Sequence, residues 1–241
     1  METTANQQFP NTHWSLVLSA RDGSEISARR ALGDLCEMYW YPLYAFARRS
    51  GKRPEDAADL TQGLFESLIS HESIAGLQED RCRFRSFLIG AMKNYMADQH
   101  DNGVSEKRGG GVLHVSIELD DAEQWYGEEM RNDLSADQLY DRHWALTVLQ
   151  TVFAKLHQDY DRRGKGEQFE AIKDCLEWNS GERPYAEIAE ELSQSVPSIE
   201  LAVHRMRKRY RRLLKEEVSH TVPSKGEMRS EIGELLAALR S

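Results

Sequence analysis

Apolar residues recur along most of this chain at steps of three and four, the spacing that lines one face of an α-helix. Each such stripe predicts an amphipathic helix that buries its apolar face. Four stripes are clear, and they consist of Leu32, Leu35, Tyr39, Leu43 and Phe46; Leu60, Leu64 and Leu68; Phe84, Phe87, Leu88, Met92 and Tyr95; and Trp144, Val148, Val152 and Leu156. No series of alternating apolar and polar residues predicts a sheet, so we expect an all-α protein.

The stripes fall into two groups, which predicts two helical domains. Between them, residues 101–111 are rich in glycine and charge and have no apolar periodicity, as is typical of a linker. The acidic stretch that follows extends this predicted linker. The predicted divisions are an N-terminal extension over 1–23, a first domain over 24–101, a flexible acidic linker over 102–140, a second domain over 141–217, and an amphipathic helical tail over 218–241.

The composition favours a folded protein with no obvious catalytic chemistry. Of the 241 residues, 40% are hydrophobic and 29% are charged, which argues against disorder. The sequence has no apolar run of membrane-spanning length and no basic start followed by an apolar core, so we expect a cytoplasmic protein without a membrane partner. Three separate cysteines, Cys36, Cys82 and Cys175, form no CxxC pair.

Known catalytic and metal-binding motifs are missing from the sequence. No P-loop, zinc-protease or hydrolase motif occurs, and the eight histidines have no metal-ligand spacing. The acids Asp120, Asp121 and Glu123 suggest a solvated linker more than a metal site. We therefore expect no enzymatic activity, no cofactor and no metal.

Residues 184–214, PYAEIAEELSQSVPSIELAVHRMRKRYRRLL, indicate a helix, a short turn and a second helix. Ala189, Ser193 and Ile199 have the spacing of a helix-turn-helix, although glycine is commoner than serine at the turn. The second helix is rich in arginine and lysine, and residues 203–215 contain no acid. This local basic run favours DNA binding despite the net charge of −9. An ordinary helical hairpin with a solvated basic face remains the alternative.

The segment DAADLTQGLFESLI, residues 56–69, contains Asp59, Leu60, Gln62 and Phe65 in an order that resembles conserved region 2.2 of sigma factors. Residues 35–51 resemble region 2.1 of that family, residues 83–99 resemble regions 2.3 to 2.4, and the second domain resembles region 4. The two domains follow one another over residues 24–217 without a large middle domain. The resemblance is therefore to the extracytoplasmic-function type, one subgroup of which has extensions similar to THWSLVL and EIGELLAAL.

This resemblance implies a non-catalytic subunit that binds core RNA polymerase and promoter DNA, and it leaves room for an anti-sigma factor as a further partner. Core-polymerase binding is implied at Asp56, Asp59, Leu60, Gln62, Phe65 and Glu66. Contacts to the −10 element are implied at Arg83, Arg85, Lys93 and Asn94, after a base-capturing loop over residues 71–82. Contacts to the −35 element are implied at Ser198, Glu200, Leu201, His204, Arg205, Arg207, Lys208, Arg209 and Arg211.

The chain departs from the family pattern after the third stripe. Many relatives continue that helix with arginines, whereas residues 98–102 here are DQHDN, and Lys107 and Arg108 follow only later. This puts the upstream −10 contacts in doubt. Arg83 and Arg85 could instead pair with Glu79 and Asp80.

Two other functions stay open at this point. A stand-alone helix-turn-helix regulator would explain the second domain but not residues 56–69. An interaction protein with a degenerate first domain would explain the missing arginine run.

The tail has a stripe of its own, formed by Met228, Ile232, Leu235, Leu236 and Leu239. We expect a helix over residues 227–239 that packs on the second domain. The alternative is that this helix covers a DNA-binding or polymerase-binding face.

Overall fold

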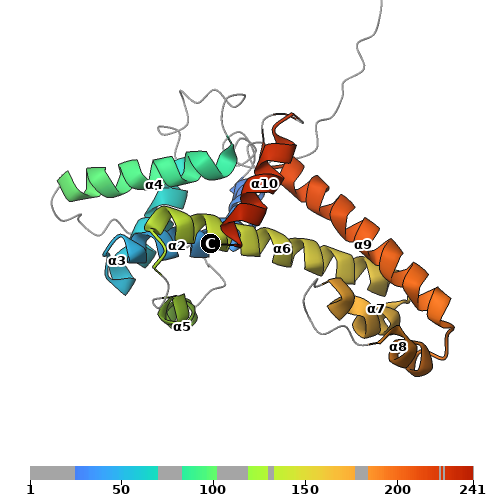
Figure 1. Cartoon of the computed structure of the whole chain (residues 1–241). Coiled ribbons are helices and arrows are strands. Elements are labelled where there is room, and N and C mark those ends of the chain that lie inside the picture. The colour runs from blue at the N-terminus through green and yellow to red at the C-terminus, as the bar shows by residue number, and fades with distance from the viewer. Residues whose placement is uncertain are drawn as a thin grey trace, which may run out of the picture. The chain divides into compact units, whose positions relative to one another are not determined.

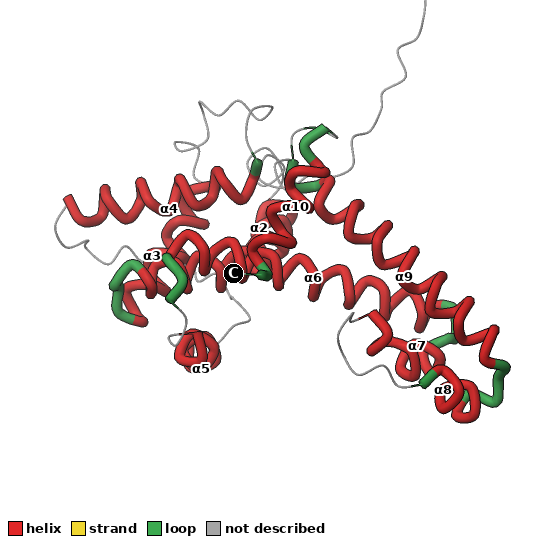
Figure 2. Tube along the Cα trace, viewed as in Figure 1, coloured by secondary structure: helices red, strands yellow, loops and turns green. Residues whose placement is uncertain are grey.

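Helices account for all the regular secondary structure in the computed structural model, which describes residues 25–69, 83–101, 119–129, 133–176, 184–222, 224 and 226–240 (Figure 2). The all-α prediction is therefore confirmed for these residues. The α-helices are α2 (Glu25–Arg49), α3 (Pro54–Ile69), α4 (Phe84–Asp101), α5 (Leu119–Glu129), α6 (Ala136–Arg162), α7 (Gly166–Ile172), α8 (Tyr185–Glu191), α9 (Val196–Ser219) and α10 (Met228–Ala238), and η1 (Lys173–Leu176) is a 3₁₀ helix (Figure 1).

These helices form two compact units. The first comprises residues 1–147 together with 218–241, and the second comprises residues 148–217. The boundaries fall inside α6 and inside α9, so neither lies in a loop. The tail belongs to the first unit.

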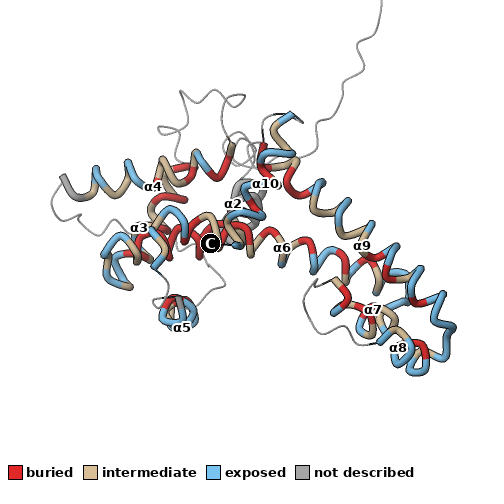
Figure 3. The backbone as a smooth tube through the Cα atoms, viewed as in Figure 1, coloured by how far each residue is buried: buried red, intermediate tan, exposed pale blue. Residues whose placement is uncertain are grey.

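The core of the first unit is formed by the predicted stripes. On α2, the side chains of Tyr39, Leu43 and Phe46 are buried. On α3, Leu64 and Leu68 are buried, whereas Leu60 is only partly so. On α4, the buried apolar residues are Phe84, Leu88 and Met92. In Figure 3, the buried stretches of the backbone are coloured red. The predicted helix periodicity is thus confirmed where the side chains are described.

A glycine in the middle of α3 has a clear packing reason. A Cβ on Gly63 would collide with the phenol oxygen of Tyr95 on α4. Glycine weakens a helix interior by about 1 kcal/mol relative to alanine, so a glycine there needs compensation. The packing of the Tyr95 phenol against Gly63 is the contact that a larger side chain would displace.

Helix α5 lies within the range that the sequence predicts as flexible linker, and this part of the prediction is wrong. Ala122 and Tyr126, four residues apart, are buried. The neighbouring residue Glu123 accepts hydrogen bonds from Arg48 Nε at 2.7 Å, from Arg48 Nη2 at 2.9 Å, and from the Tyr44 hydroxyl. Burial raises the Glu123 pKa, but the hydrogen bonds from Arg48 and Tyr44 outweigh burial and lower the pKa below its ordinary value.

Helix α6 also begins inside the predicted linker. The Ser135 hydroxyl accepts a hydrogen bond from the Gln138 amide at 3.3 Å, and the Gln138 side chain accepts one from the Ser135 amide at 2.9 Å. This reciprocal pair is a capping box, which fixes the start of a helix. Leu139, Tyr140 and Trp144 follow and are fully buried or nearly so.

The tail helix α10 packs within the first unit, which corrects the expectation that it packs on the second domain. The Phe84 amide, at the start of α4, donates a hydrogen bond to the Thr221 carbonyl at 3.0 Å. Leu235 and, unexpectedly, Glu231 are fully buried, whereas Leu236 of the predicted stripe is exposed. The buried face of α10 therefore contains a carboxylate that apolar periodicity does not reveal.

The second unit has its own core, centred on α7, η1, α8 and the parts of α6 and α9 beyond the boundary. Its buried residues are Leu156, Phe169, Ile172, Cys175, Ile188, Ala189, Ile199, Val203 and Met206. The Phe169 ring stacks on His157 with centroids 4.8 Å apart. This core holds α8 against α9 and thereby positions the site described next.

Candidate nucleic-acid interface

Helices α8 and α9 are joined by a tight turn at Leu192–Ser195 whose geometry depends on Ser193. This residue has φ of +53°, in the left-handed region that usually favours glycine. The Ser193 amide donates to the Glu190 carbonyl at 3.1 Å, and the Gln194 amide donates to the Ala189 carbonyl at 2.8 Å. These two bonds form a Schellman motif, which ends α8 and redirects the chain into α9. A helix-turn-helix is therefore present with serine at the turn.

The start of α9 has one buried and one exposed face. Ile199, Val203 and Met206 are buried against α8 and the rest of the core. The residues at which the sequence predicts base or phosphate contacts lie on the exposed face: Ser198, Glu200, Leu201, His204, Arg205, Lys208 and Arg211. Leu201 is among the exposed residues, with 47% of its surface accessible. In a helix-turn-helix these early positions reach base edges in the major groove.

Two arginines of the basic run are engaged with acceptors of their own unit. Arg207 donates from Nε and Nη2 to the Cys175 carbonyl at 2.9 and 2.7 Å. Arg209 donates to the Asp159 carboxylate, which is buried, at 2.9 Å. Both guanidinium groups therefore satisfy acceptors of the second unit. The prediction that they contact DNA is therefore not supported by their geometry.

A groove of about 1550 Å³ runs beside the exposed face of α9, within the second unit. We call it the basic groove, because eight cationic side chains and only two carboxylates line it. One wall is the turn between α6 and α7, which includes Arg163 and Lys165. The cations of the other wall are Arg205, Lys208, Arg209, Arg211, Arg212 and Lys215, and the two acids are Asp159 and Glu167.

The sequence interpretation missed Arg163 and Lys165. They lie outside the helix-turn-helix, about forty residues before the basic run of α9. Two cations in a short turn do not by themselves indicate a binding site. The local sequence RRGKG, residues 162–166, was the available clue, since glycine and clustered cations suit an exposed phosphate-binding turn.

The polar face of α3 carries most of the residues predicted to bind polymerase. Asp56 and Asp59 are exposed, and the Gln62 amide donates to Glu66 at 3.0 Å along the same face. Phe65 is only 1% exposed, so it belongs to the core and cannot be the surface anchor that was predicted. Leu60 is partly accessible and is the remaining apolar residue of the predicted set.

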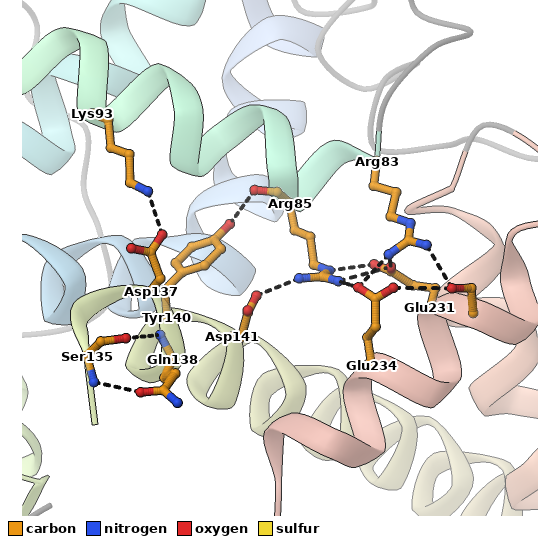
Figure 4. A network of polar contacts seen from close by, with 11 residues as sticks. Arg83, Arg85, Lys93, Ser135, Asp137, Gln138, Tyr140, Asp141, Glu231 and Glu234 are labelled. Atoms are coloured by element: carbon orange, nitrogen blue, oxygen red, sulfur yellow. Dashed lines mark hydrogen bonds and ion pairs between the residues drawn. The ribbon is translucent and has the colours of Figure 1, made fainter. Parts of the chain in front are cut away.

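The predicted −10 cations on α4 are engaged with carboxylates of the first unit (Figure 4). Arg85 is only 6% exposed. It donates to Glu231 Oε1 at 2.8 Å, to Asp141 Oδ1 at 2.5 Å, and to Glu234. Its guanidinium also lies over the Trp144 ring, 4.6 Å from the ring centroid. We call this group the Arg85 cluster; its geometry leaves Arg85 unavailable to DNA, contrary to the prediction.

Two neighbouring cations, Arg83 directly before α4 and Lys93 on α4, differ in how accessible they are. Arg83 pairs with Glu231 at 3.0 Å and Glu234 at 2.5 Å, and so joins the Arg85 cluster. The predicted alternative partners of Arg83, Glu79 and Asp80, lie outside the described residues. Lys93 forms an exposed ion pair with Asp137 at 2.6 Å.

The remaining predicted −10 positions are accessible or undescribed. Asn94 is exposed on α4. The base-capturing loop at residues 71–82, the N-terminal extension over 1–23 and the basic pair Lys107 and Arg108 all lie outside the described residues.

The arginines and carboxylates of the Arg85 cluster shift one another's pKa values. Burial opposes the positive charge of Arg85, but the surrounding carboxylates outweigh burial and raise its pKa. The hydrogen bond from Arg83 lowers the pKa of Glu234. Burial raises the pKa of Asp141, although Arg85 opposes this shift. Several carboxylates therefore stabilise the buried Arg85 cation, and two of them, Asp141 and Glu234, are half-exposed.

The described residues contain no group of three or more histidine, cysteine or acidic side chains suited to a metal. None of the described helices combines the length and the apolar composition needed to cross a bilayer. Against known proteins, the chain matches no protein-family model, no curated protein and no solved structure.

Proposed function

We propose that this chain is a sigma factor of the extracytoplasmic-function type, which binds core RNA polymerase and directs it to promoters. The observation that carries the proposal is the helix-turn-helix of α8 and α9, whose second helix exposes its first turns and adjoins the basic groove. Exposed early positions suit base reading, and the neighbouring cations suit phosphate contacts. The order of sigma-like segments in the sequence connects this DNA-binding unit to polymerase.

The polar face of α3 supports the polymerase-binding part of the proposal. Asp59 and Gln62 lie on this face, accessible to solvent, within the segment that resembles region 2.2. An interface made of polar groups around a limited apolar area suits a subunit that binds and then dissociates. With Phe65 in the core, Leu60 is the apolar contact that this face can offer.

A co-elution experiment tests this proposal. The double variant Asp59→Arg/Gln62→Arg should no longer co-elute with core polymerase, while its far-UV circular dichroism stays that of the wild type. The matched control is Asp98→Arg/Glu128→Gln, which changes the net charge equally at exposed positions of the same unit. Co-elution of the first variant at the wild-type level would remove this face from the proposal.

A stand-alone helix-turn-helix regulator is the second candidate. It is favoured by the Arg85 cluster, because Arg83 and Arg85 are occupied by carboxylates instead of facing outward. Such a regulator would bind duplex DNA without core polymerase and would not co-elute with it. The same co-elution experiment on the wild-type chain therefore separates the two candidates.

A further inference from the structure

The basic groove of the second unit has two walls that come from different parts of the chain. The turn between α6 and α7 carries Arg163 and Lys165, and the outer side of α9 carries Arg205, Lys208 and their successors. We propose that this groove binds one sugar–phosphate strand of duplex DNA, with Lys165 as a phosphate contact separate from the helix-turn-helix. The inference rests on the proposed DNA binding and adds to it a second contact element.

The charge of the groove matches an anionic backbone. Of its two carboxylates, Asp159 is buried and is already paired with Arg163 at 3.1 Å and Arg209 at 2.9 Å. Glu167 is then the one acid of the lining without such a pair in the described part of the chain. Among the other cations, Arg212 also pairs with Glu216, at 3.5 Å. The lining keeps an excess of positive charge, which attracts the phosphates of a nucleic acid.

The length of the α9 wall suits several phosphates. Arg205, Lys208, Arg212 and Lys215 follow at steps of three and four, so they share one side of the helix. From Arg205 to Lys215 the helix rises about 15 Å at about 1.5 Å per residue. One strand of B-DNA carries a phosphate about every 3.4 Å along its axis, so this wall extends past about four phosphates.

The opposite wall is held in a defined conformation. Gly164 has φ of +65°, and its amide donates to the Asp161 carbonyl at 2.9 Å. The Lys165 amide donates to the Tyr160 carbonyl at 3.0 Å. These bonds fix the backbone of the turn, while the Lys165 side chain remains exposed. A cation on a fixed backbone loses less conformational entropy on binding than one on a mobile loop.

Base reading and phosphate binding are thus divided within the unit. The first turns of α9, with Ser198 and Leu201 at the end of the groove, reach toward bases. The groove itself offers ammonium and guanidinium groups that bind phosphate regardless of sequence. Loss of a groove cation should therefore weaken binding equally for every DNA sequence.

The test uses the full-length chain and two duplexes, one of random sequence and one selected for tight binding. Fluorescence anisotropy gives the affinity at several salt concentrations for the wild type, Lys165→Ala and Arg162→Ala. Arg162 is the matched control, because it ends α6 directly before this turn and carries the same charge but does not line the groove. Neither Lys165 nor Arg162 is itself buried. The Arg162 guanidinium lies 4.0 Å from the buried Asp159 carboxylate, which keeps Arg163 and Arg209 as partners in the control variant.

We expect Lys165→Ala to flatten the slope of log affinity against log salt by about 0.9 for both duplexes. Between about 50 and 200 mM salt this removes about a threefold to fourfold change in affinity. Arg162→Ala should keep the wild-type slope. Equal slopes for all three proteins, or equal flattening by both substitutions, would overturn the groove assignment.

Two further results would also overturn it and are distinguishable. If the wild type binds neither duplex, the proposed function itself fails. If Lys165→Ala binds DNA like the wild type but co-elutes less with core polymerase, the groove holds a protein and not a phosphate backbone.

Discussion

Replacing Arg85 with methionine should destabilise the first unit by about 3 kcal/mol. The substitution removes the donors to Glu231, Asp141 and Glu234 but keeps an aliphatic chain against Trp144. Removing one partner of a buried ion pair costs about 3–5 kcal/mol, because the other charge remains buried and unpaired. Here the lower value applies, because Arg83 Nη1 still lies 3.0 Å from the Glu231 carboxylate.

The assay is equilibrium urea denaturation monitored by far-UV circular dichroism. If the denaturation curve shows two transitions, each unit is fitted with its own transition. Lys93→Met is the matched control on the same helix, since Lys93 and Asp137 form an exposed ion pair, with side chains 49% and 58% exposed. Exposed pairs contribute at most about 1 kcal/mol. A loss for Arg85→Met no larger than that for Lys93→Met would refute the reasoning.

A double-mutant cycle tests the coupling directly. Glu231→Leu alone should cost about 2 kcal/mol, because Arg85 keeps Asp141 and Glu234 as partners. The double variant Arg85→Met/Glu231→Leu should cost less than the sum of the single variants by at least about 1 kcal/mol, since it leaves no unpaired Glu231 carboxylate. Additive costs would contradict a direct interaction.

Three further predictions concern the polar contacts of α9 and α5. Arg211→Ala should reduce the slope of log affinity against log salt by about one unit in an anisotropy titration, because Arg211 is exposed. Arg207→Ala should leave this slope unchanged. It should lower the free energy of unfolding in urea by about 1–3 kcal/mol, because the Cys175 carbonyl loses its donor. Glu200→Lys should change one position of the consensus selected from random −35 sequences, by about 1–3 kcal/mol of preference; an unchanged consensus with higher general affinity would mean that Glu200 only favours the positive end of α9. The lowered pKa of Glu123 means that its carboxylate stabilises the fold above its ordinary pKa of 4.5 and that this stability is lost as the pH falls through the folded pKa. Glu123→Gln should therefore lose less stability than the wild type between about pH 6 and pH 3 in urea titrations, and equal losses would contradict this.

Local patterns predicted the features whose cause is local. The helical stripes on α2, α3, α4 and α6 were visible because burial repeats every three or four residues. The start of α6 could also have been predicted, since Ser135 and Gln138 have the spacing of a capping box. The burial of Phe65 could also have been predicted. Ala57, Leu64 and Phe65 are all buried, so the buried face of α3 is wider than the stripe of Leu60, Leu64 and Leu68.

Features that depend on distant residues could not be predicted in this way. Arg85 and Glu231 are 146 positions apart in the sequence, so no spacing rule connects them. A lone glutamate on α10 looks like a solvated residue until a buried cation is placed beside it. The basic groove is a similar case, because Lys165 meets the cations of α9 only through the folding of the second unit.

Run-off transcription with core RNA polymerase on genomic DNA fragments tests the central claim most directly. The account predicts that adding this chain produces transcripts with defined start sites, preceded by a shared sequence at the −35 and −10 positions. The variant Asp59→Arg/Gln62→Arg should abolish these transcripts. If core polymerase with the wild-type chain gives the same products as core polymerase alone, while the chain still binds duplex DNA, the sigma-factor proposal is contradicted and the stand-alone regulator takes its place.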